Sequence, residues 1–531
     1  MNIATKFTPN KIPTKDVSLE DKYLSDDGTA YMTGIQAMVR LPLAQTRRDT
    51  LNGYHTAGFI SGYRGSPVGN YDNFLWQVEG ILNDHHVVFQ SGVNEDLAAT
   101  AIWGTQQANL AGQGKYDGVT SWWYGKGPGV DRSGDVLRHA NLAGTSERGG
   151  VVAFFGDDHS CKSSSIPHQS EHVMIGCGIP IFYPTSIQQI LDLGAHAVAM
   201  SRFAGVWTSM KLVSEIVETS ASVHVDLDRV TPVLPQNIQM PEDGVNIRWP
   251  DHGIQQEERL YQYRLPAVLA YARENELNQV TWHCADARIG IAASGKGYLD
   301  TIEALRILGI EGETAQQLGL RVYQVALIWP LEPQGLREFA EGLEELIVVE
   351  EKRPILEAQI KDELYALPDG KRPRIIGKAS DGKGEWSTSI NEAPLIGHYE
   401  FQPEPIAKML AARFLKLNLP ESLKTQIENR VELLQKAEHE SRRVLDIAER
   451  KPFFCSGCPH NSSTKLPEGS RALGGIGCHY IAVLQNHETE TFTQMGGEGV
   501  SWAGASHFTN EKHIFANLGD GTYFHSGYLA I

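Results

Sequence analysis

Short apolar runs that end in glycine or polar residues recur along the chain and predict the strands of an α/β protein. The predicted strands cover 56–62, 87–90, 118–124, 151–155, 289–293, 320–325, 345–351 and 513–518. Runs of this length bounded by turn residues are typical of buried strands. Helical stretches separate most of them, so the pattern indicates several doubly wound units with parallel sheets.

The helices between these strands are recognised by their caps and their apolar faces. Asn94 is predicted to cap a helix that begins with Glu95 and Asp96, because acidic residues in a first turn favour the helix dipole. An amphipathic helix is expected near 255–275. Residues 405–450 are charged and helical in character, which indicates a solvated connector.

Interruptions of the pattern predict the domain organisation. Residues 231–251 carry repeated prolines and no periodicity, so they indicate a linker. The predicted parts are a polar leader (1–25), a first α/β domain (26–245), a linker and helix (246–277), a second α/β domain (278–400), a helical connector (401–450) and the start of an incomplete third α/β domain (451–531).

Composition restricts the setting of the protein. The 531 residues carry a formal net charge of −17, with 64 acidic and 47 basic residues, and no Lys/Arg block suggests nucleic-acid binding. The first residues lack the apolar core of a signal peptide, and no run approaches the ~18 apolar residues of a membrane span. Six cysteines do not form a disulfide framework, so a cytoplasmic location is expected.

The turn Gly519-Asp520-Gly521 follows the last predicted strand, which is expected to be buried. Glycines there let the backbone approach a phosphate, and the carboxylate of Asp520 can bind Mg²⁺ together with phosphate oxygens. Gly-Asp-Gly is also ordinary turn chemistry. The position after a strand, downstream of a Cys-x-x-Cys site, favours the phosphate interpretation.

Cys455 and Cys458 form that Cys-x-x-Cys site, and Cys478 follows in a glycine-rich segment. Thiolates bind both zinc and iron–sulfur clusters. Zinc would need a fourth ligand such as His460 or His479, whereas a cluster would need a fourth cysteine from outside the chain. A redox dithiol, or three thiols without a metal, would fit the same spacing.

Two further groups of residues have a structural and a functional interpretation. The polar stretch 157–164, followed by His168 and His172, has no clean ligand spacing and is expected to cap the next helix and line a pocket. Trp122 and Trp123 are expected in the core. Glu95 is either an ordinary first-turn carboxylate or a catalytic one.

Motifs in this order resemble the amino-terminal part of the indolepyruvate ferredoxin oxidoreductases, within the 2-oxoacid:ferredoxin oxidoreductase superfamily. The resemblance covers the whole chain, and it rests on 62–67, 94–99, Asp157-Asp158 with Ser163-Ser164, 455–460, 477–478 and 519–527.

This resemblance implies the fold of thiamine diphosphate enzymes. Residues 26–245 would then be the pyrimidine-binding domain, 278–400 a domain like the carboxy-terminal domain of transketolase, and 451–531 the beginning of the diphosphate-binding domain. It implies that Glu95 is catalytic and binds the pyrimidine ring.

The resemblance also implies the remaining site residues. Ser66, Gly519, Asp520 and Gly521 would bind the cofactor, and Asp520 would hold Mg²⁺. A [4Fe-4S] cluster would be held by the three thiols of Cys455, Cys458 and Cys478, with its fourth ligand outside the chain.

The implied reaction is oxidative decarboxylation of an aryl 2-oxoacid to an acyl-coenzyme A thioester, with electrons passed to ferredoxin by a homodimer. A non-oxidative thiamine decarboxylase or synthase, or a non-catalytic subunit, would share many of these motifs. Arg64 stands where many relatives have proline, so substrate contacts in that loop are expected to differ. The second magnesium ligand is expected beyond residue 531.

Overall fold

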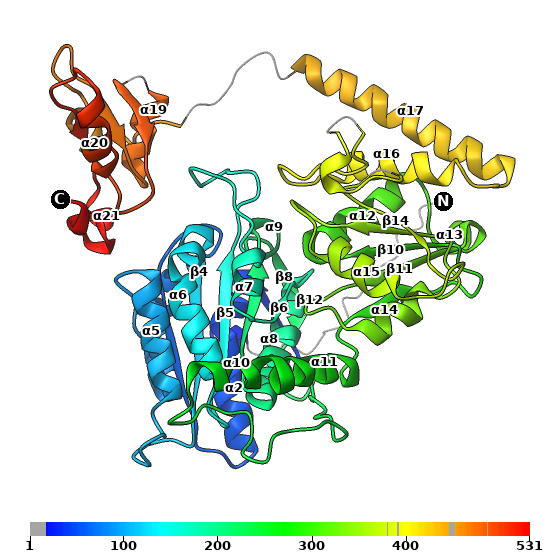
Figure 1. Ribbon diagram of the computed structural model, residues 1–531, viewed down its shortest axis with the longest axis horizontal. Helices are drawn as coiled ribbons and strands as arrows, with labels where there is room; N and C mark the ends of the chain where they lie inside the picture. Colours follow the sequence, from blue (N-terminus) through cyan, green and yellow to red (C-terminus); the bar gives the residue numbers. More distant parts are fainter. Residues whose placement is uncertain (1–16, 380, 390–391, 445–451, 486) are drawn as a thin grey trace, which may run out of the picture.

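The computed structural model describes residues 17–379, 381–389, 392–444, 452–485 and 487–531. They form three α/β units, each built on its own sheet, with an additional two-stranded ribbon (Figure 1). Most of the predicted leader lies outside the described residues, as does the end of the predicted connector.

The first unit contains a seven-stranded sheet of order β12-β6-β7-β5-β4-β2-β3, parallel except for β12. Its strands are β2 (Ala57–Gly62), β3 (Val87–Phe89), β4 (Val119–Lys126), β5 (Val151–Gly156), β6 (Ile181–Phe182), β7 (Trp207–Leu212) and β12 (Leu327–Trp329). The predicted α/β class with parallel sheets is confirmed. The antiparallel edge strand β12 comes from the sequence of the second unit.

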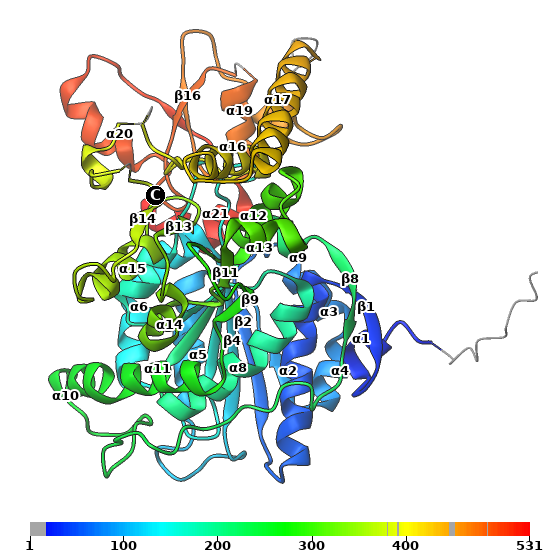
Figure 2. The same ribbon diagram turned by 90° about the vertical axis from the view of Figure 1, so that its right-hand side faces the viewer.

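Helices cover this sheet, and β1 (Thr29–Thr33) pairs antiparallel with β8 (Ser220–His224) beside it (Figure 2). The helices are α1 (Asp21–Leu24), α2 (Gly34–Leu51), α3 (Tyr71–Gln77), α4 (Glu79–Asp84), α5 (Glu95–Gln106), α6 (Gly127–Ala143), α7 (Glu171–Gly176), α8 (Ile187–Ala204) and α9 (Ser214–Val217). Trp122 and Trp123 are fully buried in the core, as predicted.

A helical segment connects the first two sheets. It runs through α10 (Gly253–Arg259), a π-helical stretch (Leu260–Arg264) and α11 (Leu265–Glu274). This confirms the helix predicted near 255–275. The buried guanidinium of Arg264 donates hydrogen bonds to three carbonyl groups at the end of α6, among them Leu142 at 2.8 Å, so the segment is tied to the first unit.

The second unit has a five-stranded sheet of order β14-β13-β10-β11-β9, in which only β9 is antiparallel. Its strands are β9 (Gln279–Trp282), β10 (Ile289–Ala293), β11 (Leu320–Gln324), β13 (Glu345–Val349) and β14 (Arg374–Ile376). Its helices are α12 (Gly295–Ile307), α13 (Gly312–Leu318), α14 (Pro333–Ala340), α15 (Leu356–Tyr365), α16 (Pro403–Phe414) and the long α17 (Glu421–Val444).

The third unit has a small parallel sheet of order β16-β15-β17. Its elements are β15 (Ala472–Gly474), β16 (Thr489–Phe492), β17 (Phe515–Ala516), α18 (His460–Ser463), α19 (Ile481–Leu484), α20 (Val500–Ala505) and α21 (Asp520–His525). The expectation of a buried strand at 513–518 is wrong, because β17 has only two residues and both are exposed. It pairs with β15 on one side, and its side chains remain open to solvent.

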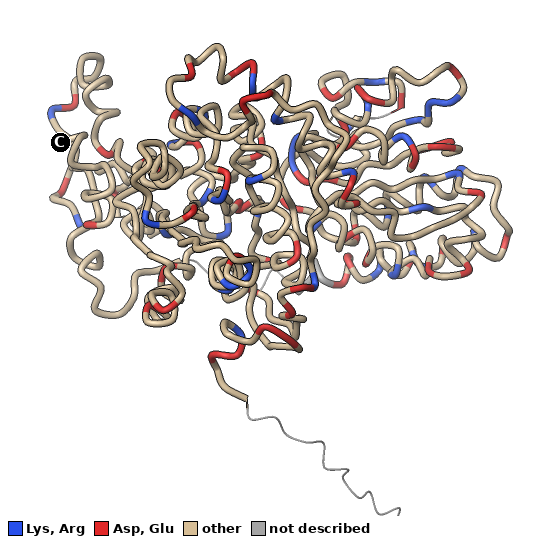
Figure 3. The backbone as a smooth tube through the Cα atoms, turned by 90° about the horizontal axis from the view of Figure 1, so that it is seen from below, with Lys and Arg blue, Asp and Glu red and all other residues tan. Residues whose placement is uncertain are grey.

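Charged residues are interspersed along the whole chain (Figure 3). Within the described ranges, no helix combines the length and the apolar character that crossing a membrane requires.

Candidate functional site

The carboxyl ends of the strands in the first sheet carry the polar loops that the sequence singled out. Glu95 is the first residue of α5, shortly after β3. The side chain of Asn94 accepts a hydrogen bond from the Leu97 amide at 3.0 Å, which confirms the predicted helix start. Ligands of parallel α/β sheets bind at this edge.

Glu95 is 5% exposed, and its surroundings are tightly built. A Cβ atom added to Gly129, in the first turn of α6, would lie 2.4 Å from Glu95 Cγ and 2.6 Å from Oε1. The indole nitrogen of Trp123 donates a hydrogen bond to the Glu95 carbonyl oxygen at 3.0 Å. The carboxylate is therefore held in a cradle that requires glycine at position 129.

The third unit reaches Glu95 through His525 at the end of α21. His525 Nε2 lies 2.7 Å from Glu95 Oε2, and Nδ1 lies 2.6 Å from Ser526 Oγ. The side chain of Asn94 donates to the His525 carbonyl oxygen at 2.9 Å, and the ring of Tyr63 packs edge-on against the imidazole at 4.8 Å. Sequence reasoning missed His525, although its position five residues after Asp520 places both on one short helix.

The Gly-Asp-Gly loop therefore lies beside the loop that follows β2. A Cβ atom on Gly521 would be 3.7 Å from the Tyr63 hydroxyl oxygen. Burial, and then the nearby carboxylates of Glu95 and Asp520, raise the pKa of Tyr63, with Arg64 opposing. Glu95 and Asp520 both act on one tyrosine, although they lie at opposite ends of the chain.

Buried polar atoms without partners mark the strand ends of the third sheet. Among the described residues, both ring nitrogens of His479, Thr493 Oγ1 and Asn517 Nδ2 are buried and have no hydrogen-bond partner. Thr493 directly follows β16, Asn517 directly follows β17, and a Cβ atom on Gly519 would lie 3.4 Å from His479 Nδ1.

Burial, and then the neighbouring His460, lower the pKa of His479 to about 4, so its imidazole is neutral at pH 7. Unpaired buried donors are costly. This set of hydroxyl, amide and imidazole groups next to the Gly-Asp-Gly loop fits a polyanionic ligand such as a diphosphate.

The proposed metal ligands are not assembled. Cys455 and Cys478 are exposed and Cys458 is half-buried. Across the described ranges, no group of three or more His, Cys, Asp or Glu side chains is arranged to hold a metal ion. The three-thiol site and the magnesium role of Asp520, which is itself exposed, stay predictions.

The loop after β2 contains Ser66, the predicted cofactor-binding residue, which is half-buried. The side chain of Pro67 packs against Gly156 at the end of β5, where an added Cβ would lie 2.7 Å from Pro67 Cδ. Arg64 is largely exposed; its Nε lies 3.2 Å from Asp72 Oδ2, and its guanidinium lies 5.6 Å from the Trp76 ring centroid. Arg64 is thus occupied by contacts within its own loop region.

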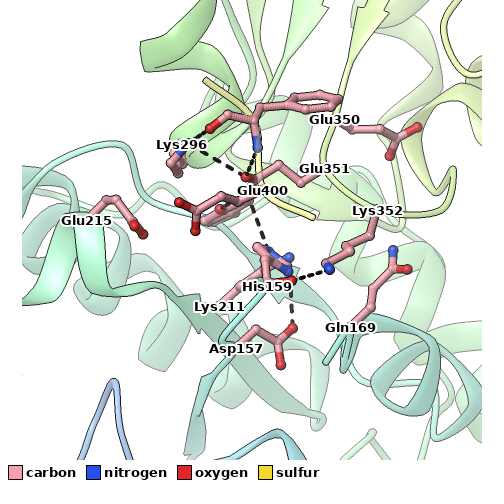
Figure 4. Close-up of polar contacts among 12 residues, drawn as sticks. Asp157, His159, Gln169, Lys211, Glu215, Lys296, Glu350, Glu351, Lys352 and Glu400 are labelled. Atoms are coloured by element: carbon pink, nitrogen blue, oxygen red, sulfur yellow. Dashed lines mark hydrogen bonds and ion pairs between the residues drawn. The ribbon is translucent and has the colours of Figure 1, made fainter. Parts of the chain in front are cut away.

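A buried charge network joins the first and second units beside this edge (Figure 4). Lys211, at the end of β7, is 1% exposed and pairs with Glu171, while Asp157 Oδ2 lies 3.9 Å away. Burial alone would lower the pKa of Lys211, but the carboxylates of Glu171 and Asp157 raise it. The network therefore keeps Lys211 charged in a fully buried position.

The second unit contributes Glu351, Lys352 and Lys296 to this network. Glu351 Oε2 lies 3.4 Å from His159 Nε2, and Glu351 Oε1 lies 3.7 Å from Lys296 Nζ. Lys352 donates to the His159 carbonyl oxygen. The polar stretch 157–164 thus lines a small cavity between the units, which was predicted in part; the residues of the second unit were not foreseen.

Comparison with known proteins identifies the relatives of this chain. The family model "Indolepyruvate ferredoxin oxidoreductase middle domain" matches residues 278–444. The indolepyruvate oxidoreductase subunit IorA of Methanothermobacter thermautotrophicus is 23% identical over 488 residues, covering 88% of this chain and 68% of that protein. IorA of Pyrococcus abyssi is 26% identical over 419 residues, covering 72% of this chain and 57% of that protein.

The fold is also found among solved structures. The 2-oxoglutarate:ferredoxin oxidoreductase from Magnetococcus marinus, solved with 2-oxoglutarate, coenzyme A and succinyl-CoA bound, superposes with a TM-score of 0.52 at 14% identity, over 73% of this chain and 65% of that one. The resemblance inferred from the motifs is confirmed: over most of its length the chain is a relative of the indolepyruvate oxidoreductase IorA subunits, and residues 278–444 match the middle domain of that family.

Proposed function

We propose that this chain is the thiamine diphosphate-binding part of an aryl 2-oxoacid:ferredoxin oxidoreductase that converts an indolepyruvate-like acid to an acyl-coenzyme A. The names of the sequence relatives support oxidation of a 2-oxoacid as the class of activity. Residues 26–245 would bind the pyrimidine end of the cofactor, and residues 451–531 would begin the domain for the diphosphate end.

One observation carries this proposal: the buried Glu95 carboxylate meets the helix that begins at Asp520, through His525. A cofactor held at its two ends by two α/β units needs such a meeting of strand ends. The unpaired groups of His479, Thr493 and Asn517 supply donors where a diphosphate would lie.

The chain's own residues then have separate roles. Thiamine diphosphate supplies a nucleophilic carbon for decarboxylation of the 2-oxoacid. Glu95 holds a proton near the pyrimidine ring and keeps that ring in its reactive tautomer. Gly129 and Trp123 fix the position of Glu95, and the packed walls around it exclude water from the carboxylate.

Further cofactors and partners are part of the same proposal. Asp520 would hold Mg²⁺, and Cys455, Cys458 and Cys478 would hold a [4Fe-4S] cluster with a fourth ligand from elsewhere. Because the structure does not assemble these thiols, no step of the reaction is assigned to them. Coenzyme A, ferredoxin and a second copy of the chain are the proposed partners.

The test uses the complete protein with thiamine diphosphate, Mg²⁺, indolepyruvate and coenzyme A, and it follows reduction of ferredoxin. Glu95→Gln is expected to lower turnover by at least about 100-fold, since positioned proton transfer typically contributes that much. Asp96→Asn is the matched control: Asp96 is the next residue of α5, and it pairs with Arg132 at the surface.

The outcomes separate the competing functions. Equal loss in both variants would mean that helix α5 is disturbed and would remove the catalytic assignment of Glu95. Decarboxylation to an aldehyde without coenzyme A or ferredoxin would show a non-oxidative enzyme instead. Iron and sulfide analysis of the complete protein tests the cluster, and zinc without iron would favour a zinc site.

A further inference from the structure

Lys126 is the last residue of β4, and it emerges beside Glu95. The two glycines nearest to it on either side are both in contact with Glu95. A Cβ atom on Gly125 would lie 3.4 Å from Glu95 Cγ, and one on Gly129 would lie 2.4 Å from the same atom. The Lys126 side chain therefore leaves the sheet next to the carboxylate of the proposed active site.

The Lys126 side chain is held between two loops. A Cβ atom on Gly65 would lie 2.4 Å from Lys126 Cδ, so the alkyl chain lies against the loop that follows β2. The ammonium group donates to Ser164 Oγ at 2.8 Å and to the Ser163 carbonyl oxygen at 3.3 Å. These neutral acceptors orient the charge without neutralising it.

No described carboxylate forms an ion pair with Lys126. Asp158 is near enough to oppose the effect of burial, which lowers the pKa of Lys126. The Asp158 oxygens, however, accept hydrogen bonds from the Lys162 amide at 2.9 Å and the Ser163 amide at 2.7 Å. Lys162, on the same loop, is paired with Glu400 at 2.6 Å. A half-buried ammonium that lacks a counterion favours binding of an anion.

The substrate of the proposed reaction carries one carboxylate, directly beside its keto group. We propose that Lys126 binds this carboxylate and thereby selects 2-oxoacids over neutral carbonyl compounds. This inference rests on the proposed function and adds to it the residue that recognises the acid. Lys126 contacts the substrate and leaves proton transfer to Glu95.

The second unit positions this lysine through the loop 157–164. Lys352 donates to the His159 carbonyl oxygen, and Ser160 Oγ donates to Glu400 Oε2 at 2.8 Å (Figure 4). Together with the pairing of Lys162 and Glu400, these contacts fasten the loop that carries Ser163 and Ser164. The loop in turn holds the ammonium group of Lys126.

The test measures binding to the complete protein by calorimetry, with a pair of probes that share one aryl group: indole-3-propionate and its neutral amide. Lys126→Met is expected to weaken binding of the propionate by about 10- to 100-fold, the usual worth of a hydrogen bond to a charged group. The amide is expected to bind as before. Lys126→Arg keeps the charge and is expected to retain most of the affinity for the acid.

Lys162→Met serves as the matched control, because Lys162 lies on the same loop but is 61% exposed and already paired. Its affinities are expected to equal those of the wild type. Unchanged propionate affinity in Lys126→Met would overturn the inference while leaving the proposed function intact. Equal weakening of acid and amide would also overturn it, since it would show a structural role.

Pyruvate is the third probe, and it separates the inference from the proposed aryl substrate. If the wild type binds pyruvate in a Lys126-dependent way but neither indole compound, the aryl assignment fails and the role of Lys126 stands. If the loaded wild-type protein binds none of the acids, both the proposed function and the inference fail.

Discussion

His159 should make the protein lose stability in mild acid. Burial, and then the charge of Lys211, lower its pKa to about 4, although Glu351 and Glu171 oppose the shift. The ordinary pKa of histidine is about 6.5. Between these two values the unfolded chain binds a proton at this residue and the folded chain does not, so stability falls as the pH is lowered through this window.

The size of the effect follows from the two pKa values. The difference of about 2.5 units corresponds to about 3 kcal/mol below pH 4, at 1.36 kcal/mol per unit. Lowering the pH from about 7.5 to about 5 should cost about 2 kcal/mol through His159 alone. No correction for solvent screening is needed, because His159 is 4% exposed.

The assay compares urea unfolding of the wild type and His159→Asn at several pH values in this range, followed by the fluorescence of the buried tryptophans. Asparagine keeps a donor for the His168 carbonyl oxygen, which His159 Nδ1 contacts at 3.1 Å, but it does not titrate. The variant should therefore lose about 2 kcal/mol less than the wild type between the two pH values.

His439→Gln, an exposed substitution on α17, should keep the wild-type pH dependence. If the His159→Asn protein loses stability as steeply as the wild type, the buried, uncharged state assigned to His159 is wrong.

Three further predictions concern the buried charges and the site. Lys211→Met should destabilise the protein by about 3–5 kcal/mol, since two carboxylates lose their buried partner, and adding Glu171→Gln should recover a large part of this in urea unfolding. Gly129→Ala should displace the Glu95 carboxylate and lower turnover at least about 10-fold, at a stability cost of about 1–3 kcal/mol; normal turnover would contradict the cradle. Asp520→Asn in the complete protein should weaken Mg²⁺-dependent binding of thiamine diphosphate at least about 10-fold by calorimetry, with no such change if Asp520 is not a ligand.

Local signals in the sequence predicted the elements on which the site is built. The strands β2, β4 and β5 were recognised because each is a short apolar run that ends in glycine, and the start of α5 because Asn94 caps it. These features depend on neighbouring residues. The chemistry of a strand end or a helix cap is written within a few positions of sequence.

The contacts that complete the site were not predictable in the same way. Lys211 lies in an apolar strand, and nothing near it in the sequence indicates that Glu171 and Asp157 neutralise its charge. The contact of His525 with Glu95 joins residues 430 positions apart. Pairings at such separations depend on how the units dock, which no local pattern encodes.

The placement of the second unit gives it a direct connection to the chemistry. Its carboxyl-edge residues Glu351 and Lys352 contact His159, and the loop 157–164 runs from there to the Lys126 ammonium beside Glu95. The third unit approaches the same edge from the other side, through His525. Residues of the second unit are therefore expected to influence substrate binding through the position of Lys126, whereas residues of the third unit act on Glu95 itself.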